Sequence, residues 1–331
     1  MIRDRLFGWR HAFDHPVTVG ITIGILGILV LALAVIALLS ATRRVKEPLR
    51  SELWKRTLSW AVLVPCILGP VLLGAAWTIA AVALLGLACY REYARATGLF
   101  REKTVSLMVV LGILCVFFAA MDHWYGFFVA LFPLAVGLIA AGSILLDQPR
   151  GYLQRVGLGV LGFMLFGSAL GHLAYMANDG NYRPIVLLVL AGVQMNDVFA
   201  FISGKTLGRR KLLPNTSPGK TLAGHLGGIA LTTPLVAWVG HLVFRETALD
   251  RPLLLVLLGL IVSVTGQLGD LMLSSIKRDL GIKDMGATIP GHGGVLDRFN
   301  SVLLAAPAVF HFVGYFVGFG LDQPARIITG P

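Results

Sequence analysis

Charged residues are scarce in this sequence. Of its 331 residues only 14% are charged, whereas 56% are hydrophobic, and the mean hydropathy is +0.79. A soluble globular protein needs more polar surface than this, so the composition excludes the soluble classes and indicates a polytopic membrane protein. Acidic residues are the rarer sign, with 17 Asp and Glu against 28 Lys and Arg, which leaves a formal net charge of +11.

Cysteine is also rare. Cys66, Cys89 and Cys115 all fall inside apolar runs, without CxxC spacing and without a neighbouring histidine. This pattern indicates neither a redox motif nor a metal site, and we assign the three side chains to packing.

Ten apolar runs are long enough, or nearly so, to cross a hydrocarbon layer that takes roughly 20 helical residues. The second and third runs are short and share Pro65, Gly69 and Pro70, so a tight hairpin or a re-entrant pair is an alternative there. The first run exceeds the roughly 7–15 apolar residues of a typical signal peptide, and we expect a retained anchor. We therefore predict an all-α fold with about ten transmembrane helices, over residues 17–40, 58–74, 75–91, 104–121, 124–146, 154–176, 184–203, 222–245, 252–275 and 301–321.

The positive charge is distributed asymmetrically between alternate connections. The loops 41–57, 91–103, 147–155, 204–221 and 276–300 together carry 21 of the 28 Lys and Arg residues. Because Lys and Arg accumulate in cytoplasmic loops, these five loops are predicted to face the cytoplasm and both termini to lie outside it. The basic loops then adjoin anionic headgroups of the membrane, and we do not expect nucleic acid as a partner.

Ionisable residues inside apolar runs are few and are expensive to place in a membrane, so they mark candidate functional positions. Asp197 lies in the run 184–203, beside Asn196, and Asp270 lies in the run 252–275. Helical spacing puts Gln267, Asp270, Ser274 and Lys277 on one flank, where they are predicted to line one cavity. An alternative for Asp270 is a structural pair with Lys277 or Arg278 at the helix end.

The segment 281–300 is unusually rich in glycine and charge. Pro290-Gly291-His292-Gly293-Gly294 is unsuited to a helix, and glycine-rich turns let backbone N–H groups converge on an anion. Asp297 and Arg298 follow directly. A carboxylate beside such a turn, with several basic residues nearby, predicts a site for a polyphosphate bound with Mg²⁺. His292 has the alternative of being a solvated loop residue.

The loop 204–221 ends in Gly-Lys-Thr, as a P-loop does. The nucleotide-binding pattern requires a glycine where Pro214 stands, and no strand precedes the loop, so we reject a P-loop. What remains is a basic loop suited to contact a headgroup or a triphosphate.

The two polar segments together resemble the phosphatidate cytidylyltransferases, also called CDP-diacylglycerol synthases. The likeness covers about residues 150–310. The first family pattern matches at Ser274, Lys277, Arg278, Lys283, Asp284, Pro290, Gly291, His292, Gly293, Gly294, Asp297 and Arg298. The second matches at Asp197, Ala200, Phe201, Gly204, Lys205, Gly208, Lys211, Leu212, Pro214, Ser217, Pro218, Lys220, Thr221 and Gly224.

The resemblance implies a reaction in which CTP and phosphatidate, or a related lipid phosphate, give a CDP-lipid and pyrophosphate with Mg²⁺ or another divalent cation. It implies N-terminal transmembrane helices over residues 1–150, a catalytic region with cytoplasmic loops over 151–331, a cytoplasmic-membrane location and a homodimer. Asp270 and Asp297 resemble the metal-holding carboxylates, with Lys277 and Arg278 as further catalytic residues. The implied substrate-binding residues are Ser274, Lys205, Lys211, Ser217, Lys220, Lys283, His292, Gly293, Gly294 and Arg298.

Three positions depart from the family pattern. Leu273, Asn300 and Ala223 each stand where the family usually has a carboxylate. Lost negative charge is expected to weaken a second cation site or to shift substrate preference. The chain is therefore identified as a divergent member.

A second class of function is a transporter or a lipid-binding membrane protein that keeps the fold without the chemistry. Transporter sites usually lie at the midplane between inverted repeats. Here the polar residues collect toward one end of the spans, no inverted hydropathy repeat is apparent, and only Asp197 lies deep in a run, where a structural role beside a neighbouring helix is the alternative.

Overall fold

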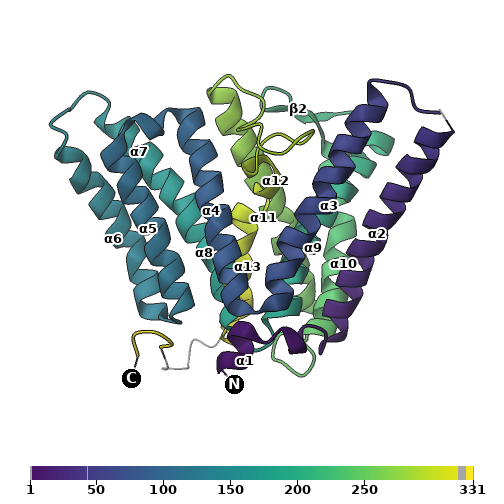
Figure 1. The fold of residues 1–331 in the computed structure, drawn as a ribbon, viewed down its shortest axis with the longest axis horizontal. Helices are drawn as coiled ribbons and strands as arrows, with labels where there is room; N and C mark the ends of the chain where they lie inside the picture. The colour runs from purple at the N-terminus through teal and green to yellow at the C-terminus, as the bar shows by residue number, and fades with distance from the viewer. Residues whose placement is uncertain (1, 43, 320–325, 331) are drawn as a thin grey trace.

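The computed structural model describes residues 2–42, 44–319 and 326–330, and in them the protein is almost entirely helical (Figure 1). A two-stranded antiparallel hairpin is formed by β1 (Lys211–Leu213) and β2 (Ser217–Thr221). The helices are α1 (Ile2–Phe7), η1 (Trp9–His11), α2 (Pro16–Ala41), α3 (Leu49–Leu73), α4 (Ala75–Thr97), η2 (Leu99–Arg101), α5 (Lys103–Met121), α6 (Tyr125–Ile144), α7 (Tyr152–Gly162), η3 (Phe163–Ala169), α8 (Leu170–Tyr175), η4 (Met176–Asn178), α9 (Tyr182–Leu207), α10 (Leu222–Val243), α11 (Pro252–Asp279), α12 (Leu296–Phe299) and α13 (Val302–Val317).

The predicted all-α membrane fold is confirmed. Nine helical segments of the described residues are long and apolar enough to cross a membrane, each within a predicted range or overlapping it. The tenth predicted span, 301–321, corresponds to α13, which has 16 residues, too few to span by itself at the usual length. Residues 320 and 321 of that predicted span lie outside the described residues.

The alternative of a re-entrant pair over 58–91 is wrong. α3 has 25 residues and α4 has 23, and both are continuous. Pro65 and Pro70 lie inside α3, which begins before the apolar run, at Leu49. The chain reverses at Gly74, whose φ of 148° is open to glycine and strained for other residues.

The predicted span 154–176 is helical but not uniform. It comprises α7, the π-helical turn η3, α8 and η4 without interruption. Most glycines of this segment lie against neighbouring helices, and a Cβ at Gly159 would come within 2.8 Å of Val105. π-Helical turns are rare and occur mostly as short bulges inside α-helices.

The helices are arranged so that the polar connections gather at one end (Figure 1). The hairpin, the loop between α11 and α12, and the α2–α3, α4–α5 and α6–α7 connections lie at the top of the view, which we call the loop end. α1 and the C-terminal segment lie at the other end. The five basic loops therefore share one side of the bundle, as their alternation predicted.

Three helices behind the loop end are joined by a polar contact. Asn196 Oδ1 in α9 accepts hydrogen bonds from Gln267 Nε2 in α11, at 3.2 Å, and from Thr232 Oγ1 in α10, at 3.4 Å. Gln267 also donates to the carbonyl of His225. Gln267 is thus part of the helix packing, and the predicted flank of Gln267, Asp270, Ser274 and Lys277 divides between this contact and the site described below.

The close approach of α10 and α11 generates a prediction. A Cβ at Gly259 would lie 2.5 Å from the carbonyl oxygen of Thr233, a backbone atom that has little freedom to move. Gly259→Ala is therefore expected to lower the unfolding free energy by about 1–3 kcal/mol through overpacking. The measurement is the midpoint of thermal unfolding in detergent.

The matched control is Gly27→Ala in α2, because nothing lies within 4 Å of a Cβ there. Alanine has the higher helix propensity, so this variant is expected to be neutral or slightly stabilising. Equal midpoints for the two variants would contradict the packing described for α10 and α11.

Candidate active site

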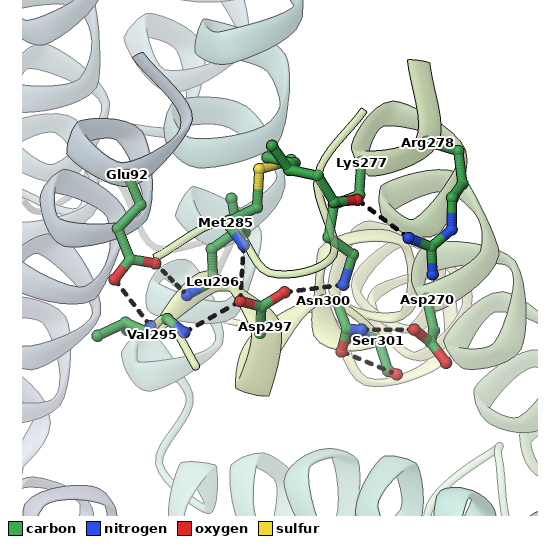
Figure 2. A network of polar contacts seen from close by, with 12 residues as sticks. Glu92, Asp270, Lys277, Arg278, Met285, Val295, Leu296, Asp297, Asn300 and Ser301 are labelled. Carbon is green, nitrogen blue, oxygen red and sulfur yellow. Dashed lines mark hydrogen bonds and ion pairs between the residues drawn. The ribbon is translucent and has the colours of Figure 1, made fainter. Parts of the chain in front are cut away.

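The glycine-rich loop between α11 and α12 is folded around Asp297 (Figure 2). Asp297 Oδ1 accepts a hydrogen bond from Lys277 Nζ at 2.8 Å, and Oδ2 accepts from the backbone N–H groups of Met285, at 2.9 Å, and Gly294, at 3.0 Å. The side chain is only 2% exposed. A buried carboxylate requires such partners, so Asp297 holds both ends of the loop against the end of α11.

Glu92 in α4 fixes the same loop from the other side, and sequence reasoning missed it. Its carboxylate accepts hydrogen bonds from Val295 N at 3.0 Å and Leu296 N at 2.9 Å (Figure 2). It also accepts one from the Thr288 hydroxyl at 2.6 Å. A Cβ at Gly294 would lie 2.3 Å from Glu92 Oε2, so glycine is required there for the approach. Glu92 falls just after the predicted run 75–91, in a predicted basic loop, so hydropathy gave no signal for it.

Asp270 is paired across the bundle and not along its own helix. One carboxylate oxygen contacts Lys220 Nζ of β2, and the other accepts a hydrogen bond from Asn300 Nδ2 at 2.6 Å. The alternative pairing with Lys277 or Arg278 is wrong, because Lys277 turns to Asp297 and the hairpin supplies the cation for Asp270. Tertiary folding of residues 211–221 decided this partner.

Asp197 lies beside Asp270 at the inner edge of the site. Its Oδ2 accepts a hydrogen bond from Ser301 Oγ at 3.3 Å, and its charge interacts with those of Asp270, Lys220 and Arg298. A structural role beside a neighbouring helix was the alternative for Asp197. That role does not account for the residue fully, because Asp197 also belongs to the polar cluster at the loop end. α9, α11, β2 and the α12–α13 turn each contribute to this cluster.

Most of the remaining predicted residues are more exposed than this cluster. Arg278 joins the hairpin to the loop, donating to the carbonyls of Thr216 at 3.3 Å and Ile282 at 3.0 Å. Lys205 in α9 is exposed and lies 5.3 Å from the Phe201 ring centroid. Lys211 and Lys283 are exposed, whereas Ser274 and Ser217 are half-buried.

The loop around His292 packs on α3. The His292 ring lies edge-on to Trp60, with 5.9 Å between centroids, and the neighbouring Pro290 carbonyl accepts a hydrogen bond from Ser59 at 2.8 Å. Burial lowers the pKa of His292, and the positive charges of Arg298 and Arg56 lower it further. Neutral imidazole is therefore favoured at neutral pH.

The glycines of this loop have the geometry that the sequence indicated. Gly291 and Gly293 have φ of 75° and 85°, in the region that favours glycine. Gly294 uses its N–H to bind Asp297. The described contacts show this part of the loop binding a protein carboxylate.

The three departures from the family pattern occupy different environments. Leu273 is fully buried in the core and Ala223 lies at the start of α10, half-buried. Asn300 stays in the site, where its amide donates to Asp270 and its carbonyl oxygen accepts from Ser301 N at 2.8 Å. Only at position 300 does a polar group replace the carboxylate within the cluster.

A divalent cation is implied by the family resemblance, and the residues fit it in part. Among the described residues no group of three or more His, Cys, Asp or Glu side chains is arranged to hold a metal ion. Mg²⁺ needs only one or two carboxylates when substrate oxygens and water complete its shell. Asp270, 20% exposed and close to Asp197, fits that role. Both oxygens of Asp297 have donors, as do both oxygens of Asp270, and a metal shared by the two residues stays a prediction.

Taken together, the fold and the cluster define an all-α integral membrane protein with paired carboxylates and lysines where its helices meet a glycine-rich loop. The sequence profile of the cytidylyltransferase family matches residues 54–316. The chain belongs to this family and is a nucleotidyltransferase.

Relatives extend the comparison over most of the chain. The uncharacterized protein YnbB of Escherichia coli (strain K12) is 33% identical over 279 residues, covering 82% of this chain and 91% of the relative. A phosphatidate cytidylyltransferase of Staphylococcus haemolyticus (strain JCSC1435) is 33% identical over 258 residues, covering 76% and 95%. That of Bacillus subtilis (strain 168) is 33% identical over 226 residues, covering 65% and 81%.

The loop anchor yields a second prediction. Glu92→Gln replaces one acceptor oxygen with an N–H donor that faces backbone N–H groups, so the loop 283–295 is expected to open more often. Losing a hydrogen bond to a charged group costs about 1.5–3 kcal/mol, which corresponds to a tenfold or larger increase in the open population. The measurement is the rate of tryptic cleavage after Lys283, which lies in the loop and is exposed.

Glu246→Gln is the control, because Glu246 is exposed at the opposite end of α10. It is expected to leave cleavage after Lys283 at the wild-type rate. A Glu92→Gln protein cleaved no faster than the control would show that Glu92 does not hold the loop.

Proposed function

We propose that the protein transfers the cytidylyl group of CTP to phosphatidate, giving CDP-diacylglycerol and pyrophosphate. Membership of the cytidylyltransferase family and the names of two of the relatives support the reaction. The observation that carries it is the cluster of Asp197, Asp270 and Lys220, formed by three separate elements beside the glycine-rich loop.

The reaction requires well-placed charged groups and little covalent catalysis by the protein. A phosphate oxygen of the lipid attacks the α-phosphorus of CTP, a new P–O bond forms, and the bond to the bridging oxygen breaks so that pyrophosphate leaves. Cationic side chains held in advance stabilise the negative charge on the transferring group. Lys220, Lys277 and Arg298, which belong to three separate elements, supply such charge.

A divalent cation, when bound, supplies Lewis-acid stabilisation of the phosphoryl oxygens. Asp270 with Asp197 would hold it, and the pair that the family pattern implies, Asp270 with Asp297, is the alternative ligand set. In the structure Lys220 neutralises Asp270 and Lys277 neutralises Asp297. We propose that these ammonium groups turn to substrate phosphates when nucleotide and metal bind.

The test is turnover by purified protein in detergent with each nucleoside triphosphate, several lipid phosphates and several divalent ions. We expect a CDP-lipid from CTP and phosphatidate that requires a divalent ion. Binding of CTP or lipid with no turnover under any ion would overturn the proposal in favour of a binding protein.

A third prediction concerns Asp270. Asp270→Asn keeps the shape of the side chain and removes its charge, so kcat/KM is expected to fall by about 100-fold or more, as when other charge-stabilising groups are removed. Raising the divalent-ion concentration is expected to recover part of the rate. Asp279→Asn, exposed at the end of the same helix, is the control and should be fully active. Wild-type activity in Asp270→Asn would remove Asp270 from the reaction.

A fourth prediction concerns orientation. We propose that the loop end faces the cytoplasm, where CTP is found, because the five basic loops gather there. In a background without the native cysteines, Lys211→Cys in the hairpin should react with a membrane-impermeant maleimide only after the cells are permeabilised. Thr247→Cys, in the α10–α11 connection at the other end, should react in intact cells, and the reverse pattern would invert the topology.

A further inference from the structure

An apolar groove of about 520 Å³ lies between α2 and α3 on one side and α9 and α10 on the other. This volume lies within the range of about 300–1,000 Å³ that is usual for small-molecule sites. α2 contributes Ile21, Gly24, Ile25, Ile28, Leu29 and Ala32, which form one stripe along that helix. The walls are almost entirely aliphatic.

One end of the groove meets the candidate active site. Arg298 is the only charged residue among the described residues that line it, and Trp60 lies at the same end, beside His292. No hydrogen bond or ion pair joins the Arg298 guanidinium to another described side chain, although its charge acts on that of Asp197. The groove therefore has a cationic head and an apolar body.

The α12–α13 turn separates the groove from the carboxylate cluster. Arg298, Phe299 and Val302 face the groove, whereas Asn300 and Ser301 bind Asp270 and Asp197. A phosphate at Arg298 would thus lie beside the carboxylates, with an attached chain leading away from them.

We propose that this groove binds an acyl chain of the lipid phosphate substrate, with the phosphate at Arg298, and that α2 forms the wall that selects chain length. The inference rests on the proposed function for the identity of the lipid. A phosphomonoester complements the unpaired guanidinium, and an acyl chain complements the aliphatic body. α2 precedes residues 54–316, so this wall lies outside the part of the chain that the family profile matches.

The groove contributes mainly by positioning the lipid and adds little to the binding affinity. An acyl chain in the bilayer is already in apolar surroundings, so moving it into the groove gains little from the hydrophobic effect. Holding the chain instead fixes the distance of the phosphate from the reacting centre, and small misplacements of reactants cost large factors in rate.

Gly24 offers a way to shorten the groove without disturbing the fold. α2 and α3 run antiparallel, with Trp54 Nε1 donating to Ser40 Oγ at 3.1 Å, so Ala32 lies nearer to the Arg298 end than Gly24 does. The rise of a helix places Gly24 about 12 Å deeper than Ala32. Nothing lies within 4 Å of a Cβ at Gly24, so a larger side chain fills space.

The test is activity of full-length Gly24→Leu with dihexanoyl and dipalmitoyl phosphatidate. The ratio of kcat/KM for the long chain to that for the short chain should fall about tenfold, the size of effect that a filled apolar pocket produces. Gly27→Leu is the matched control, since Gly27 lies on the same helix, has equal space and does not line the groove. An unchanged ratio in Gly24→Leu, or an equal fall in Gly27→Leu, overturns the proposal.

A binding measurement separates the groove from the reaction. Phosphatidate with brominated acyl chains should quench the part of the tryptophan fluorescence that is lost in Trp60→Phe, and Gly24→Leu should reduce this quenching where Gly27→Leu does not. Equal quenching by brominated phosphatidylcholine would show a groove open to any bilayer lipid and would overturn the proposal. Selective quenching in a protein that transfers no cytidylyl group would support the groove and reject the proposed function alone.

Discussion

Carboxylates set among apolar helices need partners, and that requirement organises the loop end of this protein. An unpaired charge at membrane depth is costly, so each buried acid is matched to donors. Asp297 takes Lys277 and two backbone N–H groups, and Asp270 takes Lys220 and Asn300. The hairpin and the glycine-rich loop are held on the helix ends by these contacts.

The same pairs place positive charge where a phosphoryl transfer needs it. Lys220 and Lys277 belong to different elements, and each is fixed by a carboxylate at the edge of the cluster. Glu92 adds a different kind of constraint, because it binds only backbone N–H groups and a hydroxyl and so fixes the path of the loop. Charge is thereby positioned before any substrate arrives, which is the condition for electrostatic catalysis.

The α12–α13 turn links the polar cluster to the apolar groove. Its residues alternate between the two, so one short segment bears on both the reacting end and the chain end of a lipid.

Leu273 replaces a carboxylate of the family pattern. A position where the family usually has a carboxylate is here a buried apolar contact. The protein thus keeps fewer acids near the site and relies on those that are paired.

The sequence by itself determined the membrane class, the positions of the spans and the polar segments, because hydropathy and helix length are local properties. It also predicted Asp270, Asp297, Lys220 and Lys277 as site residues, from the resemblance to a family pattern. The sequence did not predict which of these residues pair with one another. Lys220 meets Asp270 across 50 residues and Glu92 meets Leu296 across 204, contacts that depend on which helices pack together. Only the tertiary structure decided those partners, and with them the groove whose walls come from four separate helices, since helix packing depends on contacts between distant residues and not on any local period.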